Sequence, residues 1–382
     1  MFRDSKQPLL LPLSQAGPGN QYCGLKEGLI LANILGLDLV PPVFIPHGTV
    51  RKTSKSYYDF AETFDFPYFL DACKRHLDVT VVPYETARET FNDPDSTVPV
   101  MIRKEGSSRS QALEYYEFYR EIMNLAPQEH DFRFFPAAGQ FMRTREDVFH
   151  WYETIGMGKK PSLLITGLFN SVKLGGINRS GNPQPCSKNH CLNCVPNSAF
   201  DDIYQRVNKT LQFSPLIKQL GDEYIEKNFS GREFIGFHLR ICDLPRNRKF
   251  ADCYSGYSED TVWSSIAKCC ENFGVRADDV FLATPPQLFT AVSDLSLFTR
   301  DRVNTYENPD VDSHLGGMIE QYICTQAKVF LRSYTNTPDE PKKAHTRSSW
   351  AELVEGMRGE DKRDSNFTID DWINQNGSLL SA

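Results

Sequence analysis

The sequence predicts a two-domain α/β protein in which each domain is a doubly wound parallel sheet covered by helices. Two observations favour this fold class. The chain has 382 residues, more than one ordinary core accommodates and enough for two domains of about 100–200 residues each. Short apolar stretches alternate with helical patterns in both halves, which is typical of parallel sheets with crossover helices.

The first half opens with a strand, a helix and a strand. Residues 9–13 form a short apolar run, a Gly/Pro turn follows, and apolar residues recur at helical spacing from Gln21 to the stop at Gly36. A second strand is expected at 38–43, which gives this unit the length that a parallel crossover needs. Further elements are expected as follows: helices at 64–75, 113–123 and 146–155, a β-branched run at 79–82 and a strand at 163–167.

The second half repeats the alternation without repeating the sequence. Strands are expected at 234–239, 280–284 and 329–331, and helices at 259–273 and 312–327. The boundary between the halves falls between 205 and 230. We therefore assign the domains to residues 1–215 and 216–382.

Composition and charge exclude two classes of protein. The formal net charge is -7, and acidic and basic residues are mixed along the chain, so a nucleic-acid partner is not expected. No window holds the ~18 apolar residues of a membrane span. The first twelve residues lack the order of a signal peptide, so a targeting or anchor segment is expected to lie outside this sequence.

Cysteines and sequons favour an oxidising compartment. Of ten cysteines, Cys186, Cys191 and Cys194 share an insert rich in Gly, Asn and Pro, where disulfides are expected. A zinc site with His190 is the alternative. One of the adjacent Cys269 and Cys270 is expected to be a buried free thiol.

Asn-X-Ser/Thr sequons occur at Asn178, Asn208, Asn228, Asn366 and Asn376. With the cysteines they predict a glycoprotein of the secretory pathway lumen, in the endoplasmic reticulum or Golgi.

The segment IGFHLRICD, residues 235–243, places His238, Arg240 and Asp243 at the carboxyl end of an expected strand. Open α/β sheets bind their ligands at that end. Side chains alternate along a strand, so His238 and Arg240 point to one face, and a guanidinium suits a diphosphate. The alternatives are an Arg240–Asp243 pair at the sheet edge and a packing role for His238.

The turn SQAGPGNQ, residues 14–21, is the second candidate site. Glycines between a strand and a helix let backbone amides approach an anion, and Asn20 can cap the helix or contact a ligand. A tight connection without a ligand is the alternative.

Two acidic pairs invite a metal interpretation that local structure disfavours. The first pair is Asp93–Pro94–Asp95, which Pro94 makes a turn. In the second pair, Asp310–Val311–Asp312, Asp312 is better interpreted as the amino-terminal cap of the next helix than as a metal ligand. We expect metal-independent chemistry without a required cofactor.

Several segments together resemble the protein O-fucosyltransferase family. GPGNQ with LGLDLVPPVF is similar to the family's first motif, and HLRICD to its His-Leu-Arg motif. DFAETFDFPYFLDACKRHLDVTVVP, VFLATPP and IEQYICTQAKVFLRS also resemble family segments. The matches keep family order and cover most of the chain outside about 84–160.

The resemblance implies a GT-B glycosyltransferase, with two Rossmann-like domains facing across a cleft. Residues 1–215 would be the acceptor side and 216–382 the nucleotide-sugar side. It implies inverting transfer of fucose from GDP-fucose to a Ser or Thr hydroxyl of a protein acceptor. Arg240 and Asn20 would be catalytic. The residues that would hold the donor are Gly17, Pro18, Gly19, Asn20, His238, Leu239, Arg240, Asp243, Glu320, Asn336 and Thr337.

The chain departs from the family pattern in the donor pocket. Arg332 stands where the family has glycine, and the segments 283–285 and 336–338 also differ. Two alternatives therefore stay open: a related glycosyltransferase with another nucleotide sugar or a glycan acceptor, and a catalytically silent binding relative.

The general base is open as well. Gly17 stands where some members of the family have a glutamate. A solvated or helix-pairing role is favoured for Glu27, and assistance from the departing phosphate is the preferred mechanism.

Overall fold

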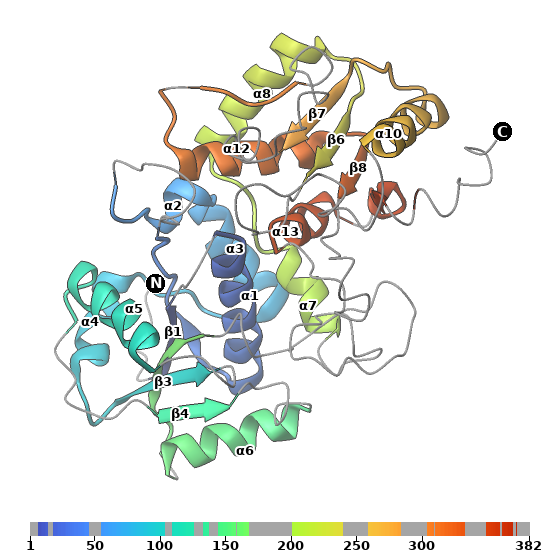
Figure 1. Ribbon diagram of the computed structural model, residues 1–382. Helices are drawn as coiled ribbons and strands as arrows, with labels where there is room; N and C mark the ends of the chain where they lie inside the picture. The colour runs from blue at the N-terminus through green and yellow to red at the C-terminus, as the bar shows by residue number, and fades with distance from the viewer. Residues whose placement is uncertain are drawn as a thin grey trace. The chain divides into compact units, whose positions relative to one another are not determined.

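The computed structural model describes residues 7–13, 18–45, 55–103, 109–125, 133–136, 144–157, 159–167, 201–239, 259–283, 304–308, 310–332, 349–359, 361–369 and 372. The chain divides between Gln212 and Phe213 into two compact units (Figure 1). Of the described residues, those before this point form the first unit and those after it form the second. The expected boundary after residue 215 lies three residues further along.

The first unit contains a five-stranded sheet with the order β2-β1-β5-β3-β4, and every pairing in it is parallel. Its elements, in chain order, are β1 Leu9–Leu13, α1 Pro18–Leu35, β2 Asp38–Leu39, α2 Phe60–Thr63, α3 Phe66–Leu77, α4 Tyr84–Asn92, β3 Thr97–Arg103, α5 Arg109–Ile122, β4 Arg133–Pro136, α6 Arg145–Gly156, β5 Ser162–Thr166 and α7 Asp201–Asn208.

The sequence places most of these elements correctly but misjudges the length of β2. The strand expected at 38–43 pairs only at Asp38 and Leu39, because Pro41 and Pro42 have no N–H to donate to a neighbouring strand. The run at 79–82 contributes a single bridge, between Leu39 and Val81. Strands β3 and β4 were not predicted.

The second unit contains a four-stranded sheet with the order β7-β6-β8-β9, again parallel throughout. Its elements are α8 Pro215–Phe229, β6 Ile235–His238, α10 Glu259–Phe273, β7 Val280–Ala283, α12 Ser313–Gln326, β8 Val329–Arg332, α13 Ser349–Arg358, the 3₁₀ helix η4 Arg363–Ser365 and β9 Asn366–Thr368. The two parallel α/β sheets confirm the predicted fold class.

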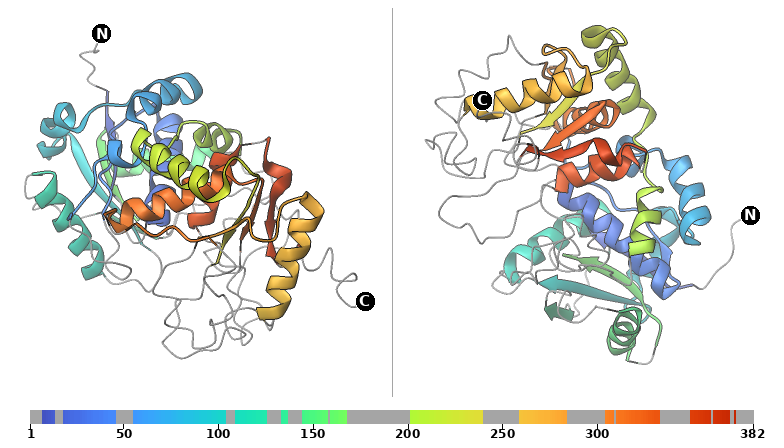
Figure 2. Two further views of the ribbon diagram at one scale, coloured as in Figure 1. Left: turned by 90° about the horizontal axis from the view of Figure 1, so that it is seen from above. Right: turned by 90° about the vertical axis from the view of Figure 1, so that its right-hand side faces the viewer.

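Helix α10 lies on one side of the second sheet and α12 lies on the other (Figure 2), and alternate residues of a strand face opposite sides. On β6, Ile235 and Phe237 lie in an apolar core with residues of α10. Gly236 faces α12, where a Cβ atom would come within 3.3 Å of Cys324 Sγ. Residues at even positions of β6 and β8 therefore share the face covered by α12 and α13.

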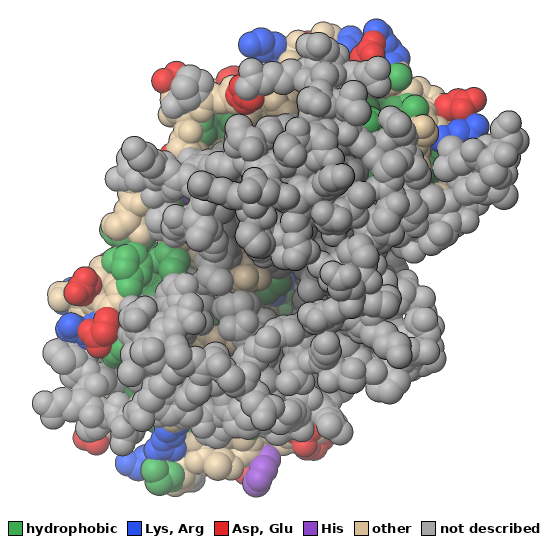
Figure 3. Space-filling view, viewed as in Figure 1, with side chains coloured by type: hydrophobic (Ala, Val, Ile, Leu, Met, Phe, Trp, Pro, Cys, Tyr) green, Lys and Arg blue, Asp and Glu red, His purple; other side chains and the backbone are tan. Residues whose placement is uncertain are grey.

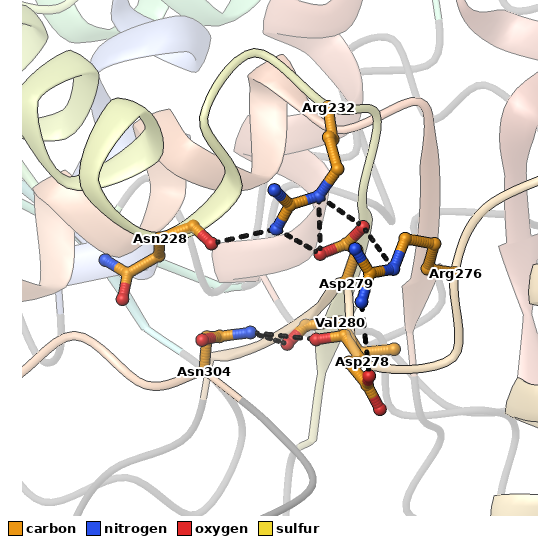
Figure 4. A network of polar contacts seen from close by, with 7 residues as sticks. All are labelled: Asn228, Arg232, Arg276, Asp278, Asp279, Val280 and Asn304. Atoms are coloured by element: carbon orange, nitrogen blue, oxygen red, sulfur yellow. Dashed lines mark hydrogen bonds and ion pairs between the residues drawn. The ribbon is translucent and has the colours of Figure 1, made fainter.

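The amino-terminal edge of this sheet is tied by a polar network around Asp279, the residue before β7 (Figure 4). Arg232 binds both carboxylate oxygens of Asp279 and also donates to the carbonyl of Asn228 at the end of α8. Arg276 lies on the other side of the carboxylate, and Asn304 donates to the carbonyl of residue 280. This network fixes the end of the sheet opposite to the carboxyl ends of its strands.

A buried arginine caps the carboxyl-terminal end of α12. Arg358, on α13, is 5% exposed, and burial lowers the pKa of its guanidinium to about 10, so the group stays charged at neutral pH. Its guanidinium donates to backbone carbonyls at this end of the helix, where no further turn supplies N–H donors, and to two side chains: the carbonyls of Cys324, Thr325, Ala327 and Lys328, and the side chains of Ser365 and Asn366.

The described cysteines are thiols. Cys23, Cys73, Cys269, Cys270 and Cys324 are free, and all but Cys23 are buried. The expectation of a buried free thiol at 269 or 270 is confirmed for both residues, and burial raises the pKa of Cys270 to about 11. Cys186, Cys191 and Cys194 lie outside the described residues, as do His190 and the sequons at Asn178 and Asn376.

No helix in the described part of the chain is long and apolar enough to cross a membrane.

The Arg358 network predicts a strong effect on stability. Arg358→Ala leaves several buried carbonyl groups without a donor, so the free energy of unfolding should fall by about 3 kcal/mol. Urea denaturation followed by tryptophan fluorescence measures this. Arg276→Ala is the control, because that side chain is 63% exposed and Arg232 still binds both oxygens of Asp279 in its absence, so the free energy of unfolding should change by less than about 0.5 kcal/mol. Equal midpoints for the two variants would contradict the role of Arg358.

Candidate functional site

The candidate site in the second unit lies where the winding of the sheet reverses. The chain adds β7 on one side of β6 and then returns to add β8 on the other side. Parallel α/β sheets bind ligands outside the carboxyl ends of the strands at such a reversal. His238 ends β6, Arg332 ends β8, and the two residues are paired in register. The topology therefore places an imidazole beside a guanidinium at the expected binding point.

His238 is held by an aromatic contact. Its ring stacks on the indole of Trp350, with 4.2 Å between ring centroids and 14° between ring planes. His238 is 6% exposed. Trp350 lies in the first turn of α13 and was not singled out from the sequence.

Arg332 is held by charge. Its Nε lies 3.0 Å from Glu355 Oε1, and the two side chains are 6% and 4% exposed. A buried guanidinium is tolerated when a carboxylate accompanies it. Glu355 lies on α13 as well, so this one helix supplies a partner to the last residue of two neighbouring strands.

Glu320 lies on the same side of the sheet as His238. It is on α12, one turn before Cys324, which packs against Gly236 of β6. Helix α12 leads into β8 and runs against the direction of the strands. Glu320, which precedes Cys324, is therefore nearer than Cys324 to the carboxyl ends of the strands. Glu320 is 6% exposed. Burial raises the pKa of Tyr224, and the negative charge of Glu320 adds to that increase.

Leu239 has a structural role. Its side chain is fully buried in the apolar core under α10, and its N–H donates to the carbonyl of Ala283. A ligand contact from Leu239 would therefore have to come from its remaining backbone atoms.

In the first unit, α1 begins at the carboxyl end of β1. Pro18 is its first residue, where the fixed φ of proline suits a helix start. Gly19 is buried and Asn20 is half-buried. The strand order reverses on either side of β1, so this helix start is also at a binding position by the same rule.

The first turn of α1 is fixed by Gln21. Its side-chain carbonyl accepts from the N–H of Ile45 at 2.9 Å, and its amide donates to the carbonyl of Ile45 at 2.7 Å. Tyr22 packs edge-on against Phe44 and Phe64. These contacts hold the segment after β2 against the helix start that carries Asn20.

Two charged residues of α1 are buried rather than solvated. Glu27 and Lys26 are each 3% exposed, so of the two roles expected for Glu27 the solvated one is wrong, and the helix-pairing one stays a prediction. The cause is the packing of α1 against α6 and α7 as well as the sheet. Lys26 donates to the side chain of Asn208 on α7 at 2.8 Å.

The acidic pairs are local turn and cap residues. Asp93 accepts from the N–H of Asp95 and from Ser96 in the turn after α4. Asp312 accepts from the N–H of His314 and caps α12, as predicted. No cluster of three or more metal-binding side chains is found among the described residues.

The structure places His238 and Glu320 on the same side of the second sheet and Leu239 in its core, and it places Pro18, Gly19 and Asn20 at the start of α1 in the first unit. The other predicted site residues lie outside the described ranges: Gly17, Arg240, Asp243, Asn336 and Thr337. On the face in Figure 3, basic and acidic side chains of described residues are interspersed rather than gathered into one block.

Comparison with solved structures finds the same fold in POFUT1. The structure of POFUT1 in complex with GDP matches with a TM-score of 0.58 at 14% identity, and the match covers 96% of this chain and 99% of that one. POFUT1 in complex with GDP-fucose matches with a TM-score of 0.55 at 12% identity, covering 96% and 98%. A search of curated protein sequences finds no match.

The fold is that of the GT-B glycosyltransferases. The family model for GDP-fucose protein O-fucosyltransferases matches residues 16–337. The chain therefore belongs to that family, and the predicted resemblance is confirmed.

The double hydrogen bond of Gln21 gives a prediction for the first unit. Gln21→Glu keeps the acceptor for Ile45 N–H but sets a buried carboxylate against a carbonyl oxygen, so at pH 7 the free energy of unfolding should fall by about 2–3 kcal/mol. Burial raises the pKa of such a carboxyl in the folded state, so lowering the pH protonates it and should restore part of the loss.

Urea denaturation at pH 7 and pH 5 measures this effect. Gln205→Glu is the control, because Gln205 is exposed on α7, and it should change stability by less than about 0.5 kcal/mol. A Gln21→Glu variant as stable as this control at pH 7 would show that the contacts to Ile45 do not hold α1.

Proposed function

We propose that the protein transfers fucose from GDP-fucose to a Ser or Thr hydroxyl of a protein acceptor, with inversion at the anomeric carbon. The second unit is the nucleotide-sugar side, and the first unit is the acceptor side. The proposal rests on one observation above all: in a member of this family, His238 ends β6 at the winding reversal of the second sheet.

Arg240 supplies the charge that the reaction requires. It follows His238 by two residues in the sequence, directly after the strand. Transfer breaks the bond between the anomeric carbon and the diphosphate oxygen, and the bonding electrons leave with GDP. A guanidinium aimed at this oxygen stabilises the negative charge that develops there.

The acceptor hydroxyl forms the new bond. Its oxygen attacks the anomeric carbon from the face opposite the leaving diphosphate, which inverts the configuration. Because the diphosphate departs on the opposite face, the hydroxyl proton reaches one of its oxygens by way of solvent, and Asn20 at the start of α1 orients the acceptor. The start of a helix adds a partial positive charge at this point.

The proposed chemistry needs no metal ion. The carboxylates of Asp93 and Asp312 are engaged by a turn and by a helix cap, which gives one carboxylate of each acidic pair a local structural role. Activity is accordingly expected to persist in excess EDTA.

The proposed compartment is the lumen of the endoplasmic reticulum or Golgi. Family membership and the sequons support it, with disulfides expected among cysteines outside the described ranges.

A second candidate function follows from Arg332. A buried arginine with its carboxylate partner occupies the end of β8, beside the position of His238, where the family pattern has glycine. This difference favours either another nucleotide sugar as donor or a relative that binds a nucleotide sugar without transferring it.

Nucleotide binding and turnover separate these functions. GDP and GDP-fucose should raise the melting temperature, whereas UDP-sugars should not, and GDP-mannose tests the choice of sugar. Arg240→Ala should lower kcat by about 100-fold or more while leaving the melting temperature of the free protein unchanged. Arg276→Ala, an exposed arginine at the opposite edge of the same sheet, should keep full activity.

Each alternative has its own result. Binding of intact GDP-fucose without hydrolysis or transfer to peptides would establish the silent relative. A larger increase of the melting temperature with another nucleotide sugar than with GDP-fucose would show that the other nucleotide sugar is the donor. An Arg240→Ala variant with normal turnover would remove Arg240 from the mechanism.

A further inference from the structure

Helix α13 makes two side-chain contacts with the candidate donor site. Trp350, in its first turn, stacks on His238 at the end of β6. Glu355, near its middle, pairs with Arg332 at the end of β8. The two strands are neighbours, so the helix spans both carboxyl ends at the point where the winding reverses.

The stack constrains the imidazole without covering its polar edge. With 14° between the ring planes, the indole lies against one face of the imidazole and opposes rotation of the ring. The nitrogen atoms of an imidazole lie in the ring plane. The indole therefore fixes the direction of the ring edge, which can donate a hydrogen bond to a phosphate oxygen, and does not itself cover that edge.

Other buried contacts hold Trp350 in place. Gln321 of α12 is fully buried, and its side-chain amide donates to the carbonyl of Trp350 at 3.2 Å. Further along α13, the Arg332–Glu355 ion pair attaches the helix to β8, and Arg358 attaches its last turn to the end of α12. The indole thus stands on a helix fixed at three points.

We propose that Trp350 is a positioning residue for donor binding: it sets the plane of the His238 ring so that the ring edge meets the diphosphate. The Arg332–Glu355 pair and Gln321 keep α13, and with it the indole, at the strand ends. This inference rests on the proposed function, because it assumes that His238 contacts the nucleotide sugar.

Trp372 provides a matched control in the same unit. It is buried, whereas Trp350 is half-buried, and it packs against the aromatic rings of Phe273 and Phe367. It donates to the carbonyl of Ser265 on α10, so it belongs to the opposite face of the sheet from His238. Its loss should reduce stability without changing the orientation of the imidazole.

The first experiment compares Trp350→Leu, Trp350→Phe and Trp372→Leu in the full chain. Trp350→Leu should weaken GDP-fucose binding by about tenfold or more and lower kcat/KM in parallel. Trp350→Phe keeps a stacking ring and should recover affinity to within about threefold of wild type. Trp372→Leu should lower the melting temperature at least as much and bind GDP-fucose as wild type does.

A second measurement detects the stack itself and needs no nucleotide. The chain has 8 histidines, and an imidazole lying on an indole experiences its ring current. In ¹H–¹³C spectra of protein labelled at histidine, one signal should be shifted upfield, disappear in His238→Asn and lose its shift in Trp350→Leu. It should persist in Trp372→Phe, a variant that retains an aromatic ring for folding.

The outcomes separate this inference from the proposed function. Wild-type protein that does not bind GDP-fucose would overturn the proposed function and this inference with it. If wild-type protein binds GDP-fucose and Trp350→Leu binds it with equal affinity, the inference alone is overturned. The absence of an upfield histidine signal that depends on Trp350 would overturn it too.

Discussion

The parallel pairing of β6 with β8 is the constraint on which the candidate site depends. It brings the last residues of two strands, His238 and Arg332, side by side at the point where the sheet changes its direction of winding. A cationic side chain at a buried strand end is costly unless it has a partner. The partner here is Glu355 on α13, and the same helix carries Trp350 to the face of His238. The position of α13 therefore determines the surroundings of both strand-end side chains.

Local patterns account for what the sequence predicts well. The apolar run at 234–239 becomes β6, the helix at 259–273 is α10 without a change of bounds, and Asp312 caps α12 as expected. Each of these depends on residues a few positions apart. The strand expected at 38–43 is shorter because Pro41 and Pro42 remove donors, and Glu27 is buried because three neighbouring elements cover α1.

The contacts around His238 depend on residues far apart in the chain. The sequence identifies His238 and Glu320 as candidates and marks Arg332 as unusual, but it gives no sign of Trp350 or Glu355. A tryptophan and a glutamate on a helix are usually core and surface residues, and only the packing of α13 against the strand ends shows otherwise. In the sequence, Arg332 at the end of an apolar strand indicates that a carboxylate is needed nearby, but it does not indicate which acidic residue supplies it.

The most direct test is a crystal structure of the protein with GDP-fucose. The account predicts that the diphosphate lies outside the carboxyl ends of β6 and β8, with an oxygen within hydrogen-bonding distance (about 3 Å) of the His238 ring edge and with the ring still stacked on Trp350. A nucleotide bound elsewhere on the protein, or a diphosphate out of reach of His238, would contradict it.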